Sequence, residues 1–172
     1  MRFERVAKYP DAIIPTRSTE FAAGYDLYAA EDTIVPSYWE TMKDMREEFE
    51  RGYDFETIMT LHPHWRPTLV PTGVKVYLDS DKKLDIIPRS STPRKKWMIV
   101  ANSYGLIDAD YADNPDNEGL IYVQLINLSS IPQMIKKGEK FAQGVITQYF
   151  TVDDDNANGQ RIGGFGSTGG YN

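Results

Sequence analysis

The sequence predicts an all-β fold that is interrupted by a short helical block. Short runs rich in apolar and β-branched residues alternate with Gly, Pro, Asn and Asp, which is typical of strands joined by tight turns. Many strands with little helix favour a sandwich or a barrel. A length of 172 residues is ordinary for one domain, so we expect a single domain over 1–172. The expected strands span residues 3–8, 26–29, 69–71, 74–78, 84–88, 98–101, 120–128 and 141–150.

Two turns between these runs are expected to close hairpins. Pro71-Thr72-Gly73 separates the runs 69–71 and 74–78, and Asn102-Ser103-Tyr104-Gly105 follows the run 98–101. Glycine tolerates the backbone conformations that tight turns require. Each turn is therefore predicted to join two strands that pair with each other.

One block departs from the β pattern. From Ser37 onward the apolar period changes from two to nearly four, and Ser37 with Glu40 forms a capping-box pattern. Gly52 is placed to end this helix, and Asp54 is placed to cap a shorter second one. We therefore predict a helical insertion at 37–64.

The apolar stripe of this block has two interpretations. It packs against the sheets, or it binds a protein partner, because an insertion has little core to cover. His62 and His64 follow the block without a third metal ligand and are interpreted as part of a turn. The stripe comprises Trp39, Met42, Met45 and Phe49, and the neighbouring aromatic residues are Tyr38, Tyr53 and Phe55.

Composition and charge limit the classes of function. The absence of Cys excludes disulfides, zinc–thiolate sites and a thiol nucleophile, and it fits a cytoplasmic protein. A net charge of -6 argues against non-specific nucleic-acid binding. The sequence shows no secretion signal and no membrane-spanning run, so we expect no membrane partner. An acidic protein that holds a polyphosphate would need local cations and bound Mg²⁺.

Two segments carry polar side chains near strand ends. Asp26, in Ala22-Ala23-Gly24-Tyr25-Asp26-Leu27, is either solvent-facing at a bend or a buried carboxylate that supports an active-site group. Arg89, in Pro88-Arg89-Ser90-Ser91-Thr92-Pro93-Arg94-Lys95-Lys96, belongs either to a phosphate-binding segment or to a solvated basic loop.

The segment Asn102-Ser103-Tyr104-Gly105-Leu106-Ile107-Asp108-Ala109-Asp110-Tyr111 has the most specific pattern. Asn102 offers one acceptor and two donors to a base edge. On an extended strand Asp108 and Asp110 would share a face, roughly 7 Å apart. One carboxylate would then activate a water while the other stays in an ion pair. The alternative is an ordinary turn rich in Asp.

The C-terminal stretch Arg161-Ile162-Gly163-Gly164-Phe165-Gly166-Ser167-Thr168 is either a flexible tail or a ligand clamp. Glycine backbones approach a phosphate closely, and the Ser and Thr hydroxyls and the Arg side chain add donors. Phe165 can stack on a base. We expect a lid at 156–172. Gln143, in Lys137-Gly138-Glu139-Lys140-Phe141-Ala142-Gln143-Gly144, is a further candidate partner for a phosphate oxygen.

These motifs, in this order, closely resemble the homotrimeric dUTPase family over roughly 22–170. The helical block looks like that of dUTPases from phages of staphylococci. The resemblance implies a jelly-roll subunit and a homotrimer with three active sites, each assembled from all three chains. It also implies hydrolysis of dUTP to dUMP and pyrophosphate, with Mg²⁺ held mainly by the substrate phosphates and water.

The resemblance further implies roles for individual residues. Asp108 would be the general base, Asp26 and Asp110 supporting carboxylates, and Phe165 would stack on uracil. Tyr111 would lie against the sugar, where a ribose 2′-hydroxyl would clash. The residues implied to contact the substrate are Arg89, Ser90, Ser91, Asn102, Gly105, Ile107, Tyr111, Gln143, Arg161, Phe165, Gly166, Ser167 and Thr168.

The chain departs from the family pattern in two places. After Tyr111 the family usually has a short Gly-acidic pair, whereas this chain continues Ala112-Asp113-Asn114-Pro115-Asp116-Asn117-Glu118-Gly119. Arg161 stands four residues before Phe165, where the family commonly has five.

Two other functions are weighed. A deaminase of the same fold acting on dCTP would need a Glu beside the base, and the motifs contain none. A regulatory protein that captures a transcriptional repressor through the helical block and the active-site region is the second alternative, and it is compatible with catalysis.

Overall fold

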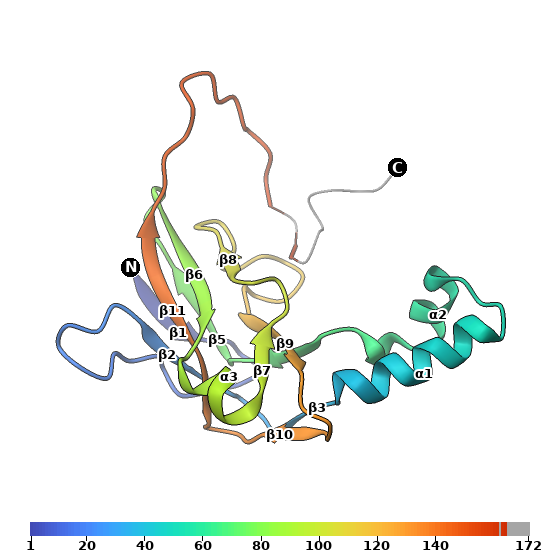
Figure 1. The fold of residues 1–172 in the computed structure, drawn as a ribbon. Helices are drawn as coiled ribbons and strands as arrows, with labels where there is room; N and C mark the ends of the chain where they lie inside the picture. The colour runs from blue at the N-terminus through green and yellow to red at the C-terminus, as the bar shows by residue number, and fades with distance from the viewer. Residues whose placement is uncertain (162, 165–172) are drawn as a thin grey trace.

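The computed structural model describes residues 1–161, 163 and 164, and most of its regular structure is antiparallel strand (Figure 1). The all-β class predicted from the sequence is therefore confirmed. In chain order the strands are β1 (Arg2–Arg5), β2 (Tyr25–Tyr28), β3 (Thr33–Val35), β4 (Thr68–Pro71), β5 (Val74–Tyr77), β6 (Lys82–Pro88), β7 (Met98–Val100), β8 (Gly105–Ile107), β9 (Tyr122–Asn127), β10 (Gln133–Ile135) and β11 (Lys140–Gln148).

Two sheets supply most of the core. One has the order β2-β11-β6-β8 and the other β4-β9-β7, and neighbouring strands in both run antiparallel. Two further pairs are β1 with β5 and β10 with β3. Along β9 buried and partly exposed residues alternate strictly, as in a strand with one face on the core. Leu27, Ile86 and Leu125, from β2, β6 and β9, belong to one buried apolar cluster.

Neither predicted hairpin forms. β4 pairs with β9 and β5 with β1, while β7 pairs with β9 and β8 with β6. The bend at Thr72 and Gly73 instead carries the chain from one sheet to another. The Thr72 N–H donates to the Ile121 carbonyl at 3.0 Å, and Gly73 has a φ of +73°. The turn residues marked the bends correctly, but the strands' partners are remote in sequence and turn chemistry does not encode them.

The sequence pattern misses the strands β3, β8 and β10. Each is three residues long and begins with Thr, Gly or Gln, so its apolar run is too short to indicate a strand; β7, equally short, lies in the continuous apolar run 98–101. The segment after β6, interpreted as a loop, contains the helix α3 (Ser91–Lys96). This helix ends at Trp97 in the left-handed region, with a φ of 53°.

The helical block is confirmed with both expected caps. The Ser37 hydroxyl accepts the N–H of Glu40, and the Asp54 carboxylate accepts the N–H of Thr57 at 2.8 Å. Figure 1 shows the two helices projecting beyond the sheets. No helix in the described part of the chain is long and apolar enough to span a bilayer. The helical elements here are α1 (Tyr38–Glu50), α2 (Phe55–Leu61) and the 3₁₀ turn η1 (Pro63–Trp65).

Candidate active site

A pocket of about 300 Å³ lies where β8 and the turn after it meet β9 and the C-terminal segment. Its lining combines apolar side chains with a few polar groups, as small-ligand sites do. Residues singled out in the segment 102–111 meet here with Arg161, which is remote in the sequence. They are Asn102, Gly105, Ile107, Asp108, Tyr111 and Arg161.

The pairing of β8 with β6 places the candidate base at the pocket. Gly105 lies opposite Ile86, and a Cβ on Gly105 would stand 3.3 Å from the Ile86 Cβ, so a small residue allows the close approach. Ile107 is buried and ends β8, and Asp108 follows it. The Asp108 carbonyl accepts the Tyr111 N–H at 3.1 Å, which closes a turn. The prediction that the two aspartates stand on an extended strand is therefore wrong, because pairing with β6 ends at Ile107.

Both aspartates nevertheless reach one cation. Arg161 Nε donates to Asp110 Oδ1 at 2.7 Å, and Arg161 Nη2 pairs with Asp108 Oδ2. Burial disfavours the guanidinium charge, but the hydrogen bonds that Arg161 donates to both aspartates and the charges of these carboxylates outweigh burial and raise the pKa of Arg161 above its ordinary value. We expected one carboxylate in an ion pair, and in this structure both are paired.

Tyr111 lies beside this ion pair. Its side chain is 7% exposed, and Arg161 Cζ stands 5.8 Å from the ring centroid. The phenol donates to the Leu120 carbonyl at 3.2 Å and accepts from Asn117 Nδ2 at 2.9 Å. Burial raises the pKa of Tyr111, with the hydrogen bond from Asn117 acting in the opposite direction. The phenol therefore stays neutral at physiological pH.

A second polar cluster surrounds Asp26 on β2. Its carboxylate pairs with Arg89 Nε at 2.8 Å and accepts from Lys140 Nζ at 2.8 Å and from Ser18 Oγ at 2.6 Å. Burial tends to raise the pKa of Asp26, but the hydrogen bonds from Lys140 and Ser18 and the charge of Arg89 hold it below its ordinary value. With only 5% of Asp26 exposed, the carboxylate is buried and the solvent-facing interpretation is wrong, while support of an active-site group stays a prediction.

The basic segment after β6 lines a separate pocket of about 160 Å³. Such a concentration of cations and hydroxyls suits an anion. Ser90 stands at the N-terminus of α3. This pocket and the pocket at Asp108 share no lining residue. Its donors are Arg89, Ser91, Thr92, Lys95, Lys96 and Lys140.

Gln143 lies on β11 close to this segment. Its Nε2 donates to the Pro88 carbonyl at 3.1 Å, and a Cβ on Gly24 would come within 2.5 Å of its Oε1. The remaining expected contacts of the lid lie outside the described residues. They are Phe165, Gly166, Ser167 and Thr168.

Sequence reasoning assigned no role to Lys140 or Asn117. Lys140 holds Asp26 from 114 positions away, and Asn117 holds Tyr111 from within the extended turn. Lys140 lies in the segment 137–144 and Asn117 in the extended turn 112–119, and the sequence had already indicated both segments as candidates. The side-chain partners of these two residues could not be predicted from the sequence, because the contacts depend on how distant strands pair.

Metal binding by protein groups alone has no support in the part of the chain that the structure describes. No cluster of three His, Cys, Asp or Glu side chains is placed there to hold an ion. Asp26 is already bound to two cations, and Asp108 and Asp110 share Arg161. His62 stacks on Trp65, with ring centroids 4.0 Å apart. A Mg²⁺ ion at this site would take most of its oxygen ligands from a bound substrate and water.

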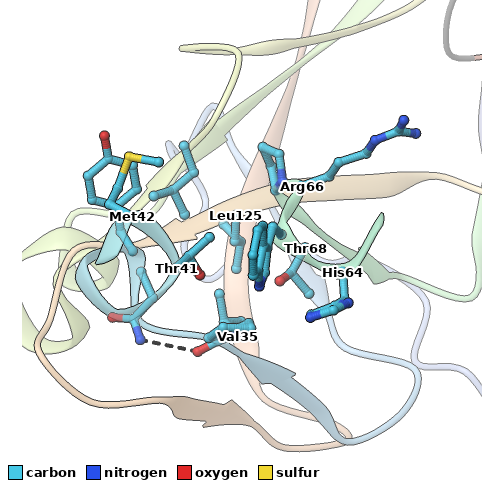
Figure 2. Close-up of a pocket in the computed structure, with 13 residues that line it drawn as sticks. Val35, Thr41, Met42, His64, Arg66, Thr68 and Leu125 are labelled. Atoms are coloured by element: carbon cyan, nitrogen blue, oxygen red, sulfur yellow. Dashed lines mark hydrogen bonds between the residues drawn. The ribbon is translucent and has the colours of Figure 1, made fainter. Parts of the chain in front are cut away.

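The helical block is partly packed and partly exposed. Met45 of the stripe is buried, whereas Trp39 and Phe49 are 60% and 46% exposed, so packing accounts for only part of the stripe and partner binding stays a prediction. Trp39 Nε1 donates to the Leu128 carbonyl at 3.0 Å and ties α1 to the end of β9. Figure 2 shows a pocket of about 100 Å³ between α1, the segment 64–68 and β9.

The sequence and the structure were compared with protein families, curated proteins and solved structures, and all three comparisons match the same family. A family model described as dUTPase matches residues 45–169. Deoxyuridine 5'-triphosphate nucleotidohydrolase of Lactococcus lactis is 39% identical over 171 residues, covering 97% of this chain and 96% of that protein. The crystal structure of dUTPase from Streptococcus mutans is 34% identical with a TM-score of 0.71, covering 89% of this chain and 99% of that one.

A phage protein shares the fold at lower identity. The dUTPase of Staphylococcus bacteriophage 80alpha, solved as a D81N mutant with dUpNHpp, has a TM-score of 0.61 at 16% identity and covers 92% of this chain and 96% of its own. It is described among phage dUTPases that control transfer of virulence genes. The two relatives of higher identity are bacterial, so the phage type stays a hypothesis.

Proposed function

This chain belongs to the dUTPase family and has its all-β fold, and we propose that it hydrolyses dUTP to dUMP and pyrophosphate. The observation that carries the proposal is the convergence of Asn102, Asp108 and Tyr111 on one pocket of about 300 Å³. These three side chains supply an amide, a carboxylate and an aromatic ring, which suit a base, a water and a sugar.

Asp108 is the proposed general base. It orients a water for in-line attack on the α-phosphate and accepts the proton that the water loses. Positioning and charge neutralisation carry such a displacement more than covalent chemistry does. Arg161 pairs with Asp108 in this structure, so a contact between its guanidinium and the terminal phosphates would require the guanidinium to leave the carboxylate. Asp110 supports this arrangement as the second partner of Arg161.

The base and the sugar are proposed to occupy the pocket beside β8. The Asn102 amide and the backbone at Gly105 and Ile107 read the uracil edge. Gly105 packs closely against Ile86, which fixes the position of this backbone at the pocket. The face of Tyr111 contacts the deoxyribose, where an added 2′-hydroxyl would clash.

The phosphates are proposed to lie on the basic segment. Arg89, fixed by Asp26, together with Ser90, Ser91 and Gln143 binds the phosphate oxygens. The lid at 156–172 then closes, with Phe165 on uracil and with Arg161, Gly166, Ser167 and Thr168 on the phosphates.

Mg²⁺ is the proposed cofactor. When bound, it would neutralise charge on the triphosphate and help to align the α-phosphate. Asp108 and Asp110 are the carboxylates at this pocket and both pair with Arg161 in this structure, so we propose that phosphates and water supply most ligands of the ion. Arg89 and Lys140 supply the fixed positive charge of the protein itself.

A homotrimer is the proposed assembly. In one chain the pocket at Asp108 and the basic pocket at Arg89 share no lining residue. A triphosphate site that uses both sets of donors is completed if they come from different chains. Sedimentation or light scattering gives the mass that tests this assembly.

The test of the enzymatic proposal is pyrophosphate release from dUTP, dCTP, dTTP and UTP, with Mg²⁺ and with chelator. We expect release from dUTP alone, and we expect chelation to abolish it. Asp108→Asn should bind dUTP nearly normally yet lose about 10²–10⁴-fold in turnover, because other groups carry binding. Ammonia without pyrophosphate would indicate the deaminase instead, and turnover near that of the unchanged protein would exclude Asp108 as the base.

A second function is favoured by the exposed aromatic residues of the helical block. Trp39, Phe49, Tyr53 and Phe55 are each at least 45% exposed, and aromatic residues dominate the binding energy of protein interfaces. We propose that this surface binds a protein partner, with a transcriptional repressor as the candidate. A partner that also engages the active-site region should compete with dUTP, which a binding assay with and without nucleotide would reveal.

A further inference from the structure

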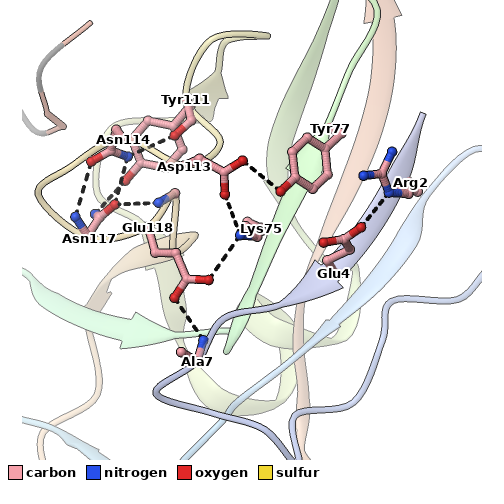
Figure 3. A network of polar contacts seen from close by, with 11 residues as sticks. Arg2, Glu4, Ala7, Lys75, Tyr77, Tyr111, Asp113, Asn114, Asn117 and Glu118 are labelled. Atoms are coloured by element: carbon pink, nitrogen blue, oxygen red, sulfur yellow. Dashed lines mark hydrogen bonds and ion pairs between the residues drawn. The ribbon is translucent and has the colours of Figure 1, made fainter.

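The extended turn 112–119 holds Tyr111 on its inner side (Figure 3). Asn117 Nδ2 donates to the Tyr111 phenol at 2.9 Å, and Asn114 Nδ2 donates to the Tyr111 carbonyl at 2.8 Å. The phenol in turn donates to the Leu120 carbonyl at 3.2 Å. The ring is therefore fixed both at its backbone and at its hydroxyl.

Asn117 is itself held in one orientation. Its Oδ1 accepts from Asn114 Nδ2 at 2.9 Å and from the Gly119 N–H at 3.0 Å, which leaves Nδ2 directed at the phenol. Gly119 has a φ of +82°, and a Cβ there would lie 2.7 Å from the Ala112 Cα. Residues 112 and 119 are thus in contact, and Asn117 is held by hydrogen bonds within the turn that they close.

The outer side of the turn is anchored to β5 and to the segment after β1. Lys75 Nζ binds the carboxylates of Asp113 and Glu118, and the Tyr77 hydroxyl donates to Asp113 at 2.8 Å. Glu118 also accepts the Ala7 N–H at 2.8 Å. Burial opposes the charge of Lys75, but the hydrogen bonds that it donates to both carboxylates outweigh burial and raise the pKa of Lys75 above its ordinary value.

We propose that the turn 112–119 sets the selectivity for deoxyribose over ribose, with Asn117 as the positioning residue for Tyr111. This inference rests on the proposed function, in which Tyr111 contacts the sugar. The Tyr111 ring can exclude the 2′-hydroxyl of ribose only if the ring keeps its position. An apolar surface that can shift discriminates poorly between ligands that differ by one hydroxyl group. Asn117 and Lys75 make the wall rigid by tying the phenol to the turn and the turn to β5.

The test is the ratio of kcat/KM for dUTP to kcat/KM for UTP, measured on one preparation of each variant. Both kcat/KM values scale with the concentration of folded protein, so a variant that only folds less completely has an unchanged ratio. Asn117→Ala should lower the ratio by about tenfold, because one of the two hydrogen bonds that orient the phenol is lost. The matched control is Asp116→Asn in the same turn. This substitution changes an exposed side chain and keeps the hydrogen bond from the backbone N–H of residue 116 to Asn114 Oδ1.

A double-mutant cycle with Tyr111→Phe tests the route of the effect. Tyr111→Phe keeps the ring and removes the hydroxyl, so it should lower the ratio by a similar factor, and adding Asn117→Ala should cause little further loss. Tyr111→Phe alone decides the matter if Asn117→Ala does not fold. An unchanged ratio in either single variant, or fully additive losses, would overturn the inference. Wild-type protein that releases no pyrophosphate from dUTP would refute the proposed function instead.

Discussion

Replacing Asp26 by Asn should destabilise the protein and weaken nucleotide binding together. The carboxylate accepts from Arg89 and Ser18 and from Lys140, and it lies on β2 with 5% of its surface exposed. An amide of the same shape has one acceptor oxygen, and its other end is a donor. One of the two cations must then face an N–H group, although the volume of the side chain is unchanged.

The magnitude follows from these contacts. A hydrogen bond to a charged group contributes about 1.5–3 kcal/mol. Arg89 and Lys140 have side chains 30% and 38% exposed, so water partly solvates the charge that is released. We therefore expect a loss of about 2 kcal/mol in the free energy of unfolding. For a chain of this length this loss corresponds to about 4–8 °C in Tm.

The pH dependence supplies a second signature. Because the pKa of Asp26 is lower in the folded state, its stabilisation is present above the unfolded value of about 3.9 and is lost as pH falls through the folded value. The difference in stability between wild type and Asp26→Asn should therefore be full at pH 7. It should narrow on acidification below about pH 4.

Thermal and urea unfolding measured at several pH values, together with dUTP kinetics, check these expectations. KM for dUTP should rise by a larger factor than kcat falls, because the substitution frees Arg89, whose proposed role is to bind the phosphates and not to take part in the chemical step. The matched control is Asp11→Asn, whose ion pair with Lys137 is more than half exposed and should change stability by less than about 0.5 kcal/mol. An Asp26→Asn variant as stable as this control, with an unchanged KM, would refute the reasoning.

Three further outcomes are expected. Deleting residues 38–62 should leave hydrolysis largely intact and weaken binding of a protein partner, whereas joint loss of activity and trimer in sedimentation would show that the block is structural. Removing the chain from Gly163 onward should lower turnover more than the unfolding midpoint, because we propose that this segment acts as a lid on bound substrate; a clearly lower midpoint would contradict this. Gly24→Ala should raise KM for dUTP at nearly constant stability, because the new Cβ displaces the Gln143 amide from its place 2.5 Å away; an unchanged KM would argue against a phosphate contact by Gln143.

Local features of the sequence predicted the helical block well. Ser37 and Asp54 cap α1 and α2 by accepting N–H groups three residues ahead, so the signal and its partner lie in the same short segment. The longer strands were also predicted, since alternation over several residues reports a buried face directly. The strands β3, β8 and β10 were missed because each has only two apolar residues after Thr, Gly or Gln, which is too short a run to indicate a strand.

The fold class and the helical block could be predicted from the amino-acid sequence, because both depend on patterns among neighbouring residues. Which of the polar side chains meet depends on how the strands pair in three dimensions. Arg161 pairs with Asp108 from 53 positions away and Lys140 with Asp26 from 114, and neither predicted hairpin formed. The physical reason is that strand pairing satisfies backbone hydrogen bonds with any strand of suitable register. Proximity in space is therefore set by the sheets as a whole, and adjacent turns do not fix it.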